Sequence, residues 1–164
     1  MSLLINKIPI FAEIFLCVMI DGFSLDAYRH SVDIQVRFSD FDLQGHVSNT
    51  VYQTYYDHGK QDYFDLVLGD IDWDTQTIVG ASIKIDYLKP IWIKTRITVK
   101  TRVTHIGHKS MNFGHCIVNR VTGELISTCK AVLVCYDPRK RRSIPVPEQW
   151  QKDIMAYEGE LLFS

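Results

Sequence analysis

Two acids, a glycine-histidine pair and an asparagine fall close together, at Asp40, Asp42, Gly45, His46 and Asn49. An alternating pattern precedes this stretch and a helical pattern follows it, so it joins the end of a strand to the start of a helix. The first N–H groups of a helix have no partners inside the helix and can stabilise a developing negative charge. A carboxylate and an imidazole beside such a helix start could act as nucleophile, general base or general acid. The stretch therefore predicts a catalytic site that stabilises an anion.

The surrounding elements predict an α+β fold. Residues 31–38 alternate between apolar and polar side chains, as a half-buried strand does. From Asn49 to about Leu68, aromatic residues recur at steps of three and four, which predicts one long helix. Short turns join four further predicted strands, over residues 81–87, 93–106, 110–119 and 125–136. The aromatic face of the helix needs a partner, and a curved antiparallel sheet of five strands is the only one available.

The length and composition are typical of a single globular domain. At 164 residues the chain is long enough for one full core and too short for two comfortable ones. Its formal net charge of -1 gives no overall attraction to nucleic acid, so any basic site must be local. The cysteines show no CxxC spacing, which favours buried, reduced thiols in a cytoplasmic protein over a zinc site. These cysteines are Cys17, Cys116, Cys129 and Cys135. We expect neither a metal nor a cofactor.

An apolar extension, residues 1–27, precedes the predicted domain, and a helical tail, residues 148–164, follows it. Lys7 and Glu13 interrupt the apolar run and no clear cleavage site follows it, which disfavours a signal peptide and a membrane span. We expect the extension to pack on the domain or on a partner chain. Pro147 is well placed at the first position of the terminal helix.

The order of elements and the central stretch resemble the hotdog-fold acyl-CoA thioesterases of the hydroxybenzoyl-CoA thioesterase-like superfamily, over residues 28–147. The signature of that family runs Arg-Phe-x-acid-x-Asp-x-x-Gly-His-Val-Asn-Asn-x-x-Tyr. The matching residues are Arg37, Phe38, Asp40, Asp42, Gly45, His46, Val47, Asn49 and Tyr52. The Ile-Gly-x-x-Ser hairpin at 106–110 and the Leu-Lys-Pro strand end at 88–90 also resemble family features. Two positions depart from the pattern. Ser48 replaces an Asn, and Asp57-His58-Gly59-Lys60 replaces the more common Glu-x-x-Arg.

The resemblance implies hydrolysis of an acyl thioester carried by coenzyme A or by an acyl-carrier protein. It gives Asp42 the role of nucleophile or general base, and the main-chain N–H at about Asn49 the role of an oxyanion donor. His46 could orient water, donate to the carbonyl or protonate the leaving thiolate. Both side chains also have purely structural interpretations, Asp42 as a cap of the turn and His46 as a hydrogen-bonding partner across it. From the resemblance we also expect a homodimer, assembled further into a homotetramer.

The phosphates of coenzyme A would bind exposed basic groups near the rim of the cleft. Candidate contacts to the substrate are Gly45, Tyr52, Lys89, His108, Lys109, Ser110, Arg139 and Arg141. The run from Arg139 to Arg142 carries the strongest local positive charge, although such a run is also typical of a solvated segment. The tyrosines of the predicted helix, Tyr52 included, are expected to belong mostly to the core.

Two other functions stay open. One is a hotdog module that binds an acyl thioester without hydrolysing it, and the other is a hotdog dehydratase, which typically depends on a histidine paired with an acid across the site. The acid at Asp42 favours hydrolysis, because a pure binding module does not need the carboxylate.

Overall fold

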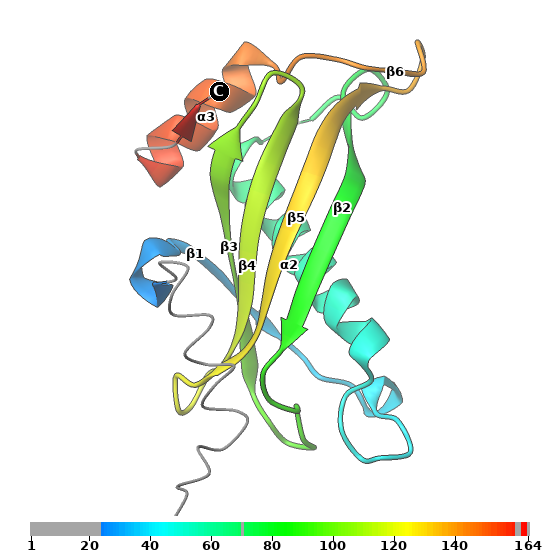
Figure 1. The fold of residues 1–164 in the computed structure, drawn as a ribbon, viewed down its shortest axis with the longest axis vertical. Helices are drawn as coiled ribbons and strands as arrows, with labels where there is room; N and C mark the ends of the chain where they lie inside the picture. Colours follow the sequence, from blue (N-terminus) through cyan, green and yellow to red (C-terminus); the bar gives the residue numbers. More distant parts are fainter. Residues whose placement is uncertain (1–23, 70, 160–161, 164) are drawn as a thin grey trace, which may run out of the picture.

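The structure is a computed structural model that describes residues 24–69, 71–159 and 162–163. Five strands form the body of one sheet, in the order β1-β3-β4-β5-β2, and neighbours in this order are antiparallel (Figure 1). Their bounds are β1 (His30–Ile34), β2 (Thr77–Tyr87), β3 (Ile97–Ile106), β4 (Ser110–Asn119) and β5 (Leu125–Asp137). The predicted five-stranded antiparallel sheet is therefore confirmed.

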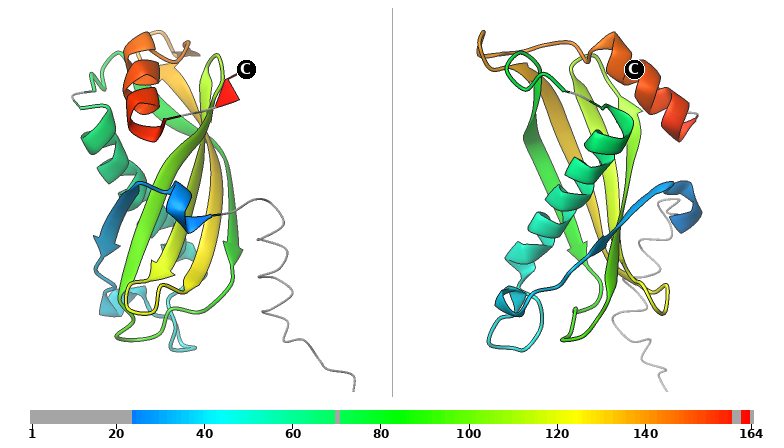
Figure 2. Two further views of the ribbon diagram at one scale, coloured as in Figure 1. Left: turned by 90° about the vertical axis from the view of Figure 1, so that its left-hand side faces the viewer. Right: turned by 180° about the vertical axis from the view of Figure 1, so that it is seen from behind.

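One long helix, α2 (Asn49–Val67), lies against one face of this curved sheet (Figure 2). Its buried residues recur at steps of three and four, as the sequence predicts, and are Tyr52, Tyr55, Tyr56, Gly59, Tyr63 and Phe64. Alternate residues of the long strands complete the same core, among them Val99, Met111, Phe113, Ile117, Cys129 and Leu133. The sheet and the helix thus share a single core, as the predicted fold requires.

The close approach between α2 and the sheet is made possible by Gly59. A Cβ atom at this position would lie 2.5 Å from Cγ1 of Val99 and 3.1 Å from Oγ1 of Thr101. Both of these residues belong to β3. The absence of a side chain at Gly59 therefore sets how deeply the helix sits on the sheet.

Four shorter elements and a second helix complete the fold. They are η1 (Leu25–Ala27), η2 (Phe38–Asp40), β6 (Arg142–Ser143), β7 (Leu162–Phe163) and α3 (Glu148–Glu158). The strand β6 pairs with β5, and β7 pairs with β3 in parallel. The helix α3 adds the buried side chains of Trp150 and Ile154 to the core, and Pro147 precedes its first residue as the N-cap.

Two predicted strands are shorter in the structure than in the sequence pattern. The first ends at Ile34, because the chain turns into η2 where the Asp40 carboxylate accepts a hydrogen bond from the Arg37 N–H at 2.7 Å. The strand expected from residue 93 begins at Ile97, because the Thr95 N–H donates to the Trp92 carbonyl at 3.0 Å and closes a turn. In both places a local hydrogen bond overrides an alternating pattern.

The expected N-terminal extension lies mostly outside the described residues, as does Cys17. The other three cysteines are buried free thiols, and burial raises the pKa of Cys116, Cys129 and Cys135 to about 12. Among the described residues, no helix combines the length and the apolar character that crossing a bilayer would need.

Candidate functional site

A tight bend precedes α2 and carries the residues that the sequence singles out. The Asp42 N–H donates to the His46 carbonyl at 3.0 Å, and the Gly45 N–H donates to the Asp42 carbonyl at 3.1 Å. Gly45 has a φ of 82°, a left-handed conformation that glycine adopts without a steric penalty. The Val47 N–H donates to the Ile91 carbonyl at 2.9 Å, which fixes the end of the bend to the loop after β2.

The side chains of Asp42 and His46 lie next to each other on this bend. Oδ2 of Asp42 is 3.8 Å from Nδ1 of His46, and their side chains are 34% and 23% exposed. Oδ1 of Asp42 accepts a hydrogen bond from the Gln44 N–H at 2.8 Å. The carboxylate is therefore held in place through one oxygen, while the other faces the imidazole and solvent.

The imidazole of His46 is held at both of its nitrogens. Nδ1 lies 3.1 Å from the Val47 carbonyl, and Nε2 lies 2.9 Å from Oε1 of Gln44. The ring of Trp92 meets the imidazole edge-on, with 5.8 Å between ring centroids. Sequence reasoning missed both Gln44 and Trp92. Gln44 occupies a variable position of the signature, and Trp92 lies on a loop distant in sequence that a single β-bridge joins to His46.

The start of α2 presents main-chain donors beside this bend. Ser48 precedes the helix in an extended conformation, with φ -60° and ψ 138°, and makes no side-chain cap to it. Within the described ranges, no acceptor receives the N–H groups of Asn49 and Thr50, whereas the Val51 N–H donates to the Ser48 carbonyl. These unpaired amides lie at a helix start, where negative charge is favoured.

Asp40 holds the bend against the helix. Its Oδ2 accepts hydrogen bonds from the Arg37 N–H and from the Tyr55 hydroxyl, both at 2.7 Å. Its carbonyl accepts a hydrogen bond from the Ser48 N–H at 2.9 Å. Burial, followed by the hydrogen bond to Asp40, raises the pKa of Tyr55. Asp40 thus ties three segments of chain together and has a structural role.

Tyr52 is packed inside the protein, consistent with its expected place in the core. Its ring meets that of Tyr87 edge-on at 5.0 Å, and its hydroxyl donates to the Lys89 carbonyl at 3.3 Å. Burial raises the pKa of Tyr52 to about 12. Lys89 lies at the same end of the molecule, where its ammonium group pairs with Glu124. Of these two predicted contacts, only Lys89 presents its polar group near the surface.

The remaining predicted contacts lie at the other end of the sheet. Figure 1 shows the hairpin between β3 and β4 and the segment leading to β6 at the upper end, with the start of α2 at the lower end. The residues concerned are His108, Lys109, Ser110, Arg139 and Arg141. The ten residues of β3 alone separate the two ends by about 33 Å, at about 3.3 Å a residue. Within one protomer, the structure does not bring these residues to Asp42.

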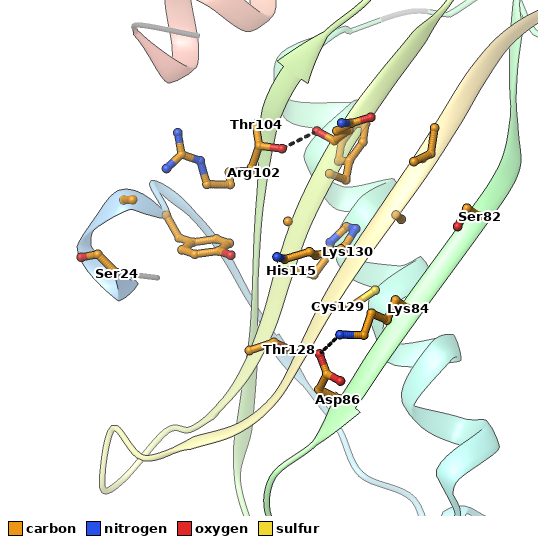
Figure 3. Close-up of a pocket in the computed structure, with 17 residues that line it drawn as sticks. Ser24, Ser82, Lys84, Asp86, Arg102, Thr104, His115, Thr128, Cys129 and Lys130 are labelled. Atoms are coloured by element: carbon orange, nitrogen blue, oxygen red, sulfur yellow. Dashed lines mark hydrogen bonds and ion pairs between the residues drawn. The ribbon is translucent and has the colours of Figure 1, made fainter. Parts of the chain in front are cut away.

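A cavity of about 550 Å³ lies on the sheet face that points away from α2 (Figure 3). Lys84, Asp86, Arg102 and Lys130 contribute to its lining, and the Lys84 ammonium lies 3.3 Å from the Asp86 carboxylate. A smaller hollow of about 280 Å³ lies between α2 and β2. The described residues contain no cluster of side chains suited to hold a metal.

Comparison with known proteins places the fold and the bend in a family. Residues 36–154 match the model of the thioesterase-like superfamily. Two curated relatives from Arabidopsis thaliana are acyl-acyl carrier protein thioesterases of the chloroplast, ATL3 and ATL2. They are 24% identical over 121 residues and 26% identical over 133 residues, which cover 72% and 79% of this chain. The chain spans 63% of the length of the first relative and 68% of the second.

A solved thioesterase structure is similar to this chain over a larger share of both chains. It is a thioesterase from Thermus thermophilus complexed with coenzyme A and Zn, 30% identical in sequence, with a TM-score of 0.74 over 84% of this chain and 100% of that one. The family match includes the bend, α2 and the strands β2 to β5. The chain therefore belongs to the thioesterase-like superfamily and has its hotdog fold.

Proposed function

We propose that this protein hydrolyses an acyl thioester of coenzyme A or of an acyl-carrier protein, with Asp42 as nucleophile or general base. The observation that supports this best is the placement of the partly exposed Asp42 carboxylate on the bend that leads directly into α2. The N–H groups of Asn49 and Thr50 at that helix start have no acceptor among the described residues. A carboxylate and open amides are the two components that hydrolysis of a thioester needs.

In this mechanism the thioester carbonyl oxygen accepts a hydrogen bond from the Asn49 N–H. Asp42 then either attacks the carbonyl carbon, forming a mixed anhydride that water cleaves, or removes a proton from an attacking water. The carbon–sulfur bond breaks and the thiol leaves, while the acyl carbon gains the hydroxyl oxygen of water. In this proposal His46, which lies beside Asp42, gives the leaving thiolate its proton.

The hollow between α2 and β2 is our candidate for the acyl group. Its lining begins at Gln53, one helical turn after Asn49, and continues along the helix to Lys60. Tyr56 and Ile83 form apolar walls, while the Asp57 carboxylate and the Lys60 ammonium, 2.5 Å apart, lie at the far end of the helix segment. An acyl chain held here would place its carbonyl toward the helix start.

We further propose that two copies pair along β2, as the resemblance implies. β2 is an edge strand of the sheet, and it exposes the apolar side chains of Val79, Ile83 and Tyr87. A long exposed edge of this kind favours pairing with another strand. In an antiparallel pair, the Thr77 end of one β2 lies beside the Tyr87 end of the other. Because Arg139 lies 3.4 Å from Asp74, just before β2, pairing would bring the partner subunit's Arg139 toward the helix start.

Such pairing would reunite residues that one protomer keeps apart. The basic segment from Arg139 to Arg142 would then face the phosphates of coenzyme A, or an acidic carrier, bound at the neighbouring bend. The homotetramer and the cytoplasmic location expected from the sequence stay predictions.

The test compares wild-type protein with three variants, using a panel of acyl-CoA and acyl-carrier protein thioesters and measuring release of free thiol. Asp42→Asn keeps the shape and the acceptor for Gln44, and removes the charge. Asn49→Pro removes the main-chain N–H at the first helical position, which tolerates proline, and Ser48 already has the extended conformation that must precede a proline. Asn49→Ala keeps this N–H and serves as the matched control.

We expect Asp42→Asn to lose most activity and Asn49→Pro to lose about a hundredfold or more in kcat, while Asn49→Ala stays near wild type. Circular dichroism and light scattering must show an unchanged fold and assembly. Equal losses in Asn49→Pro and Asn49→Ala would contradict the role of the amide, and full activity of Asp42→Asn would contradict the role of the carboxylate. A wild-type protein that binds acyl thioesters without cleaving them would favour the binding module, and interconversion of hydroxyacyl and enoyl thioesters would favour the dehydratase.

A further inference from the structure

The end of the molecule around the bend exposes an unusual set of apolar side chains. Phe38 and Leu43 project from η2 and the bend, while Trp92 and Ile93 project from the loop between β2 and β3. A β-bridge between His46 and Trp92 joins the two loops. We refer to Phe38, Leu43, Trp92 and Ile93 as the apolar tip. The other large exposed apolar residues of the described chain are spread over α2, β2, α3 and turns.

Cationic residues flank the apolar tip in the sequence. Arg37 adjoins Phe38, and Lys94 and Arg96 follow Ile93, all exposed. Within the described ranges none of these three makes an ion pair. The nearest acids in sequence are Asp40 and Asp42, whose hydrogen bonds come from neutral donors, the Tyr55 hydroxyl and main-chain amides, and leave their negative charges in place. Three cations against two carboxylates still leave one excess positive charge around the tip, in a chain whose net charge is -1.

The loop geometry presents these groups outward. The Thr95 N–H donates to the Trp92 carbonyl at 3.0 Å and closes a four-residue turn, with Ile93 and Lys94 at its two central positions. Lys94 has a φ of 69°, the left-handed conformation that the third position of such a turn can require. An isoleucine beside a lysine at the tip of a turn suits a membrane surface. The isoleucine can insert shallowly into the lipid, while the lysine stays at the level of the lipid headgroups.

We propose that the apolar tip docks onto a lipid bilayer that contains anionic phospholipids. Single bulky side chains on irregular loops insert into fluid lipid without a matching surface, whereas a protein partner would have to match their shape. The unpaired cations provide the charge complementarity for anionic headgroups. Docking would place the bend and the start of α2 at the membrane surface, where amphiphilic molecules with acyl chains gather. The proposal does not depend on hydrolysis.

The test is flotation of the full-length protein with vesicles of phosphatidylcholine mixed with phosphatidylglycerol, and with vesicles of phosphatidylcholine alone. Ile93→Ser is compared with Leu66→Ser, since the two side chains are 62% and 61% exposed and Leu66 lies near the opposite end of α2. Lys94→Glu is compared with Lys152→Glu on α3, which is also exposed.

We expect binding to the anionic vesicles, weakened on the order of tenfold by each tip variant and unchanged by each control. Added salt should weaken binding as well. Absence of binding, or equal binding by tip and control variants, would overturn the proposal. A smaller assembly of Ile93→Ser in light scattering would overturn it too, because the tip would then be a contact between copies. No substrate is present, so a negative result leaves the proposed hydrolysis intact.

Discussion

The hydroxyl of Tyr63 on α2 donates a hydrogen bond to Oε1 of Glu158 on α3 at 2.8 Å. The same oxygen accepts a hydrogen bond from the Val103 N–H at 3.0 Å, next to the register shift of β3. Oε2 of Glu158 is buried without a partner among the described residues. One carboxyl group thus joins α2, α3 and β3, and burial raises its pKa, with the hydrogen bonds and the charges of Arg102 and Arg29 opposing this shift.

The raised pKa of Glu158 predicts a pH-dependent stability. The folded protein favours the protonated carboxyl, so this group's contribution is fully present below its unfolded pKa, about 4.3, and is lost as pH rises through the folded pKa. Glu158→Gln keeps the acceptor and removes the titration. In urea unfolding at a series of pH values, the variant should become more stable relative to wild type as pH rises. A difference that does not change with pH would contradict this interpretation.

Removing the Glu158 carboxyl group should destabilise the protein more than neutralising it does. Glu158→Ala leaves the Tyr63 hydroxyl and the Val103 N–H buried without their acceptor, which should lower the free energy of unfolding by about 2 kcal/mol or more. Urea unfolding at fixed pH measures this loss, and Glu148→Ala, at the exposed start of the same helix, is the matched control. Equal effects of the two substitutions would argue against the buried hydrogen bonds as the cause.

Tyr55→Phe should affect activity through Asp40. The substitution removes one of the two hydrogen bonds to Oδ2 of Asp40 and leaves the ring in place, so stability should fall by about 1 kcal/mol. Because Asp40 also holds the Ser48 amide, the bend that carries Asp42 should become less well fixed, and kcat should fall severalfold with little change in KM. Steady-state kinetics with an acyl-CoA substrate check this. A change in KM alone would indicate that Tyr55 acts on binding instead.

Gln44→Leu tests whether the orientation of His46 matters. The substitution removes the hydrogen-bond partner of Nε2, 2.9 Å away, and keeps the main-chain N–H that donates to Asp42. If His46 protonates the leaving thiolate, kcat should fall and the shape of its pH profile should change, because that profile reports the groups that exchange protons during turnover. Gln44→Asn is the conservative comparison. Loss of activity with an unchanged pH profile would assign Gln44 only a structural role.

Gly59→Ala should destabilise the protein, even though alanine favours helices by about 1 kcal/mol over glycine. The added methyl group would lie 2.5 Å from Cγ1 of Val99, so α2 or β3 must shift, and overpacking of this kind typically costs about 1–3 kcal/mol. Thermal unfolding should show a lower Tm. Gly80→Ala is the control, because a Cβ atom at Gly80 would meet no atom within 4 Å. A higher Tm for Gly59→Ala would show that the helix can move away freely.

The sequence predicts the fold and the central bend because both depend on local patterns. The aromatic spacing of Asn49 to Val67 and the alternation of the strands encode which faces are buried. The positions of Asp42 and Asn49 follow from the signature. By contrast, nothing local predicts the contact between His46 and Trp92, or the acceptor that Tyr63 finds on α3, because both depend on chain segments distant in sequence.

The separation of the basic residues from Asp42 shows a second limit of prediction from the sequence. Hairpins and loops look alike in sequence whether they lie at one end of a sheet or the other. Lys109 and Arg139 are at the far end because β3 and β5 are long and run in the same direction, each antiparallel to β4, a property of the whole sheet. Only the assembled topology shows that a second copy would be needed to bring this charge to the bend.

The open amide at Asn49 also affects how this family can diversify. A donor that belongs to the main chain is retained under every amino-acid exchange at that position except one to proline. Side chains along α2 and β2 can therefore vary in evolution, adapting the hollow to different acyl groups, while the proposed anion-stabilising group is inherited unchanged.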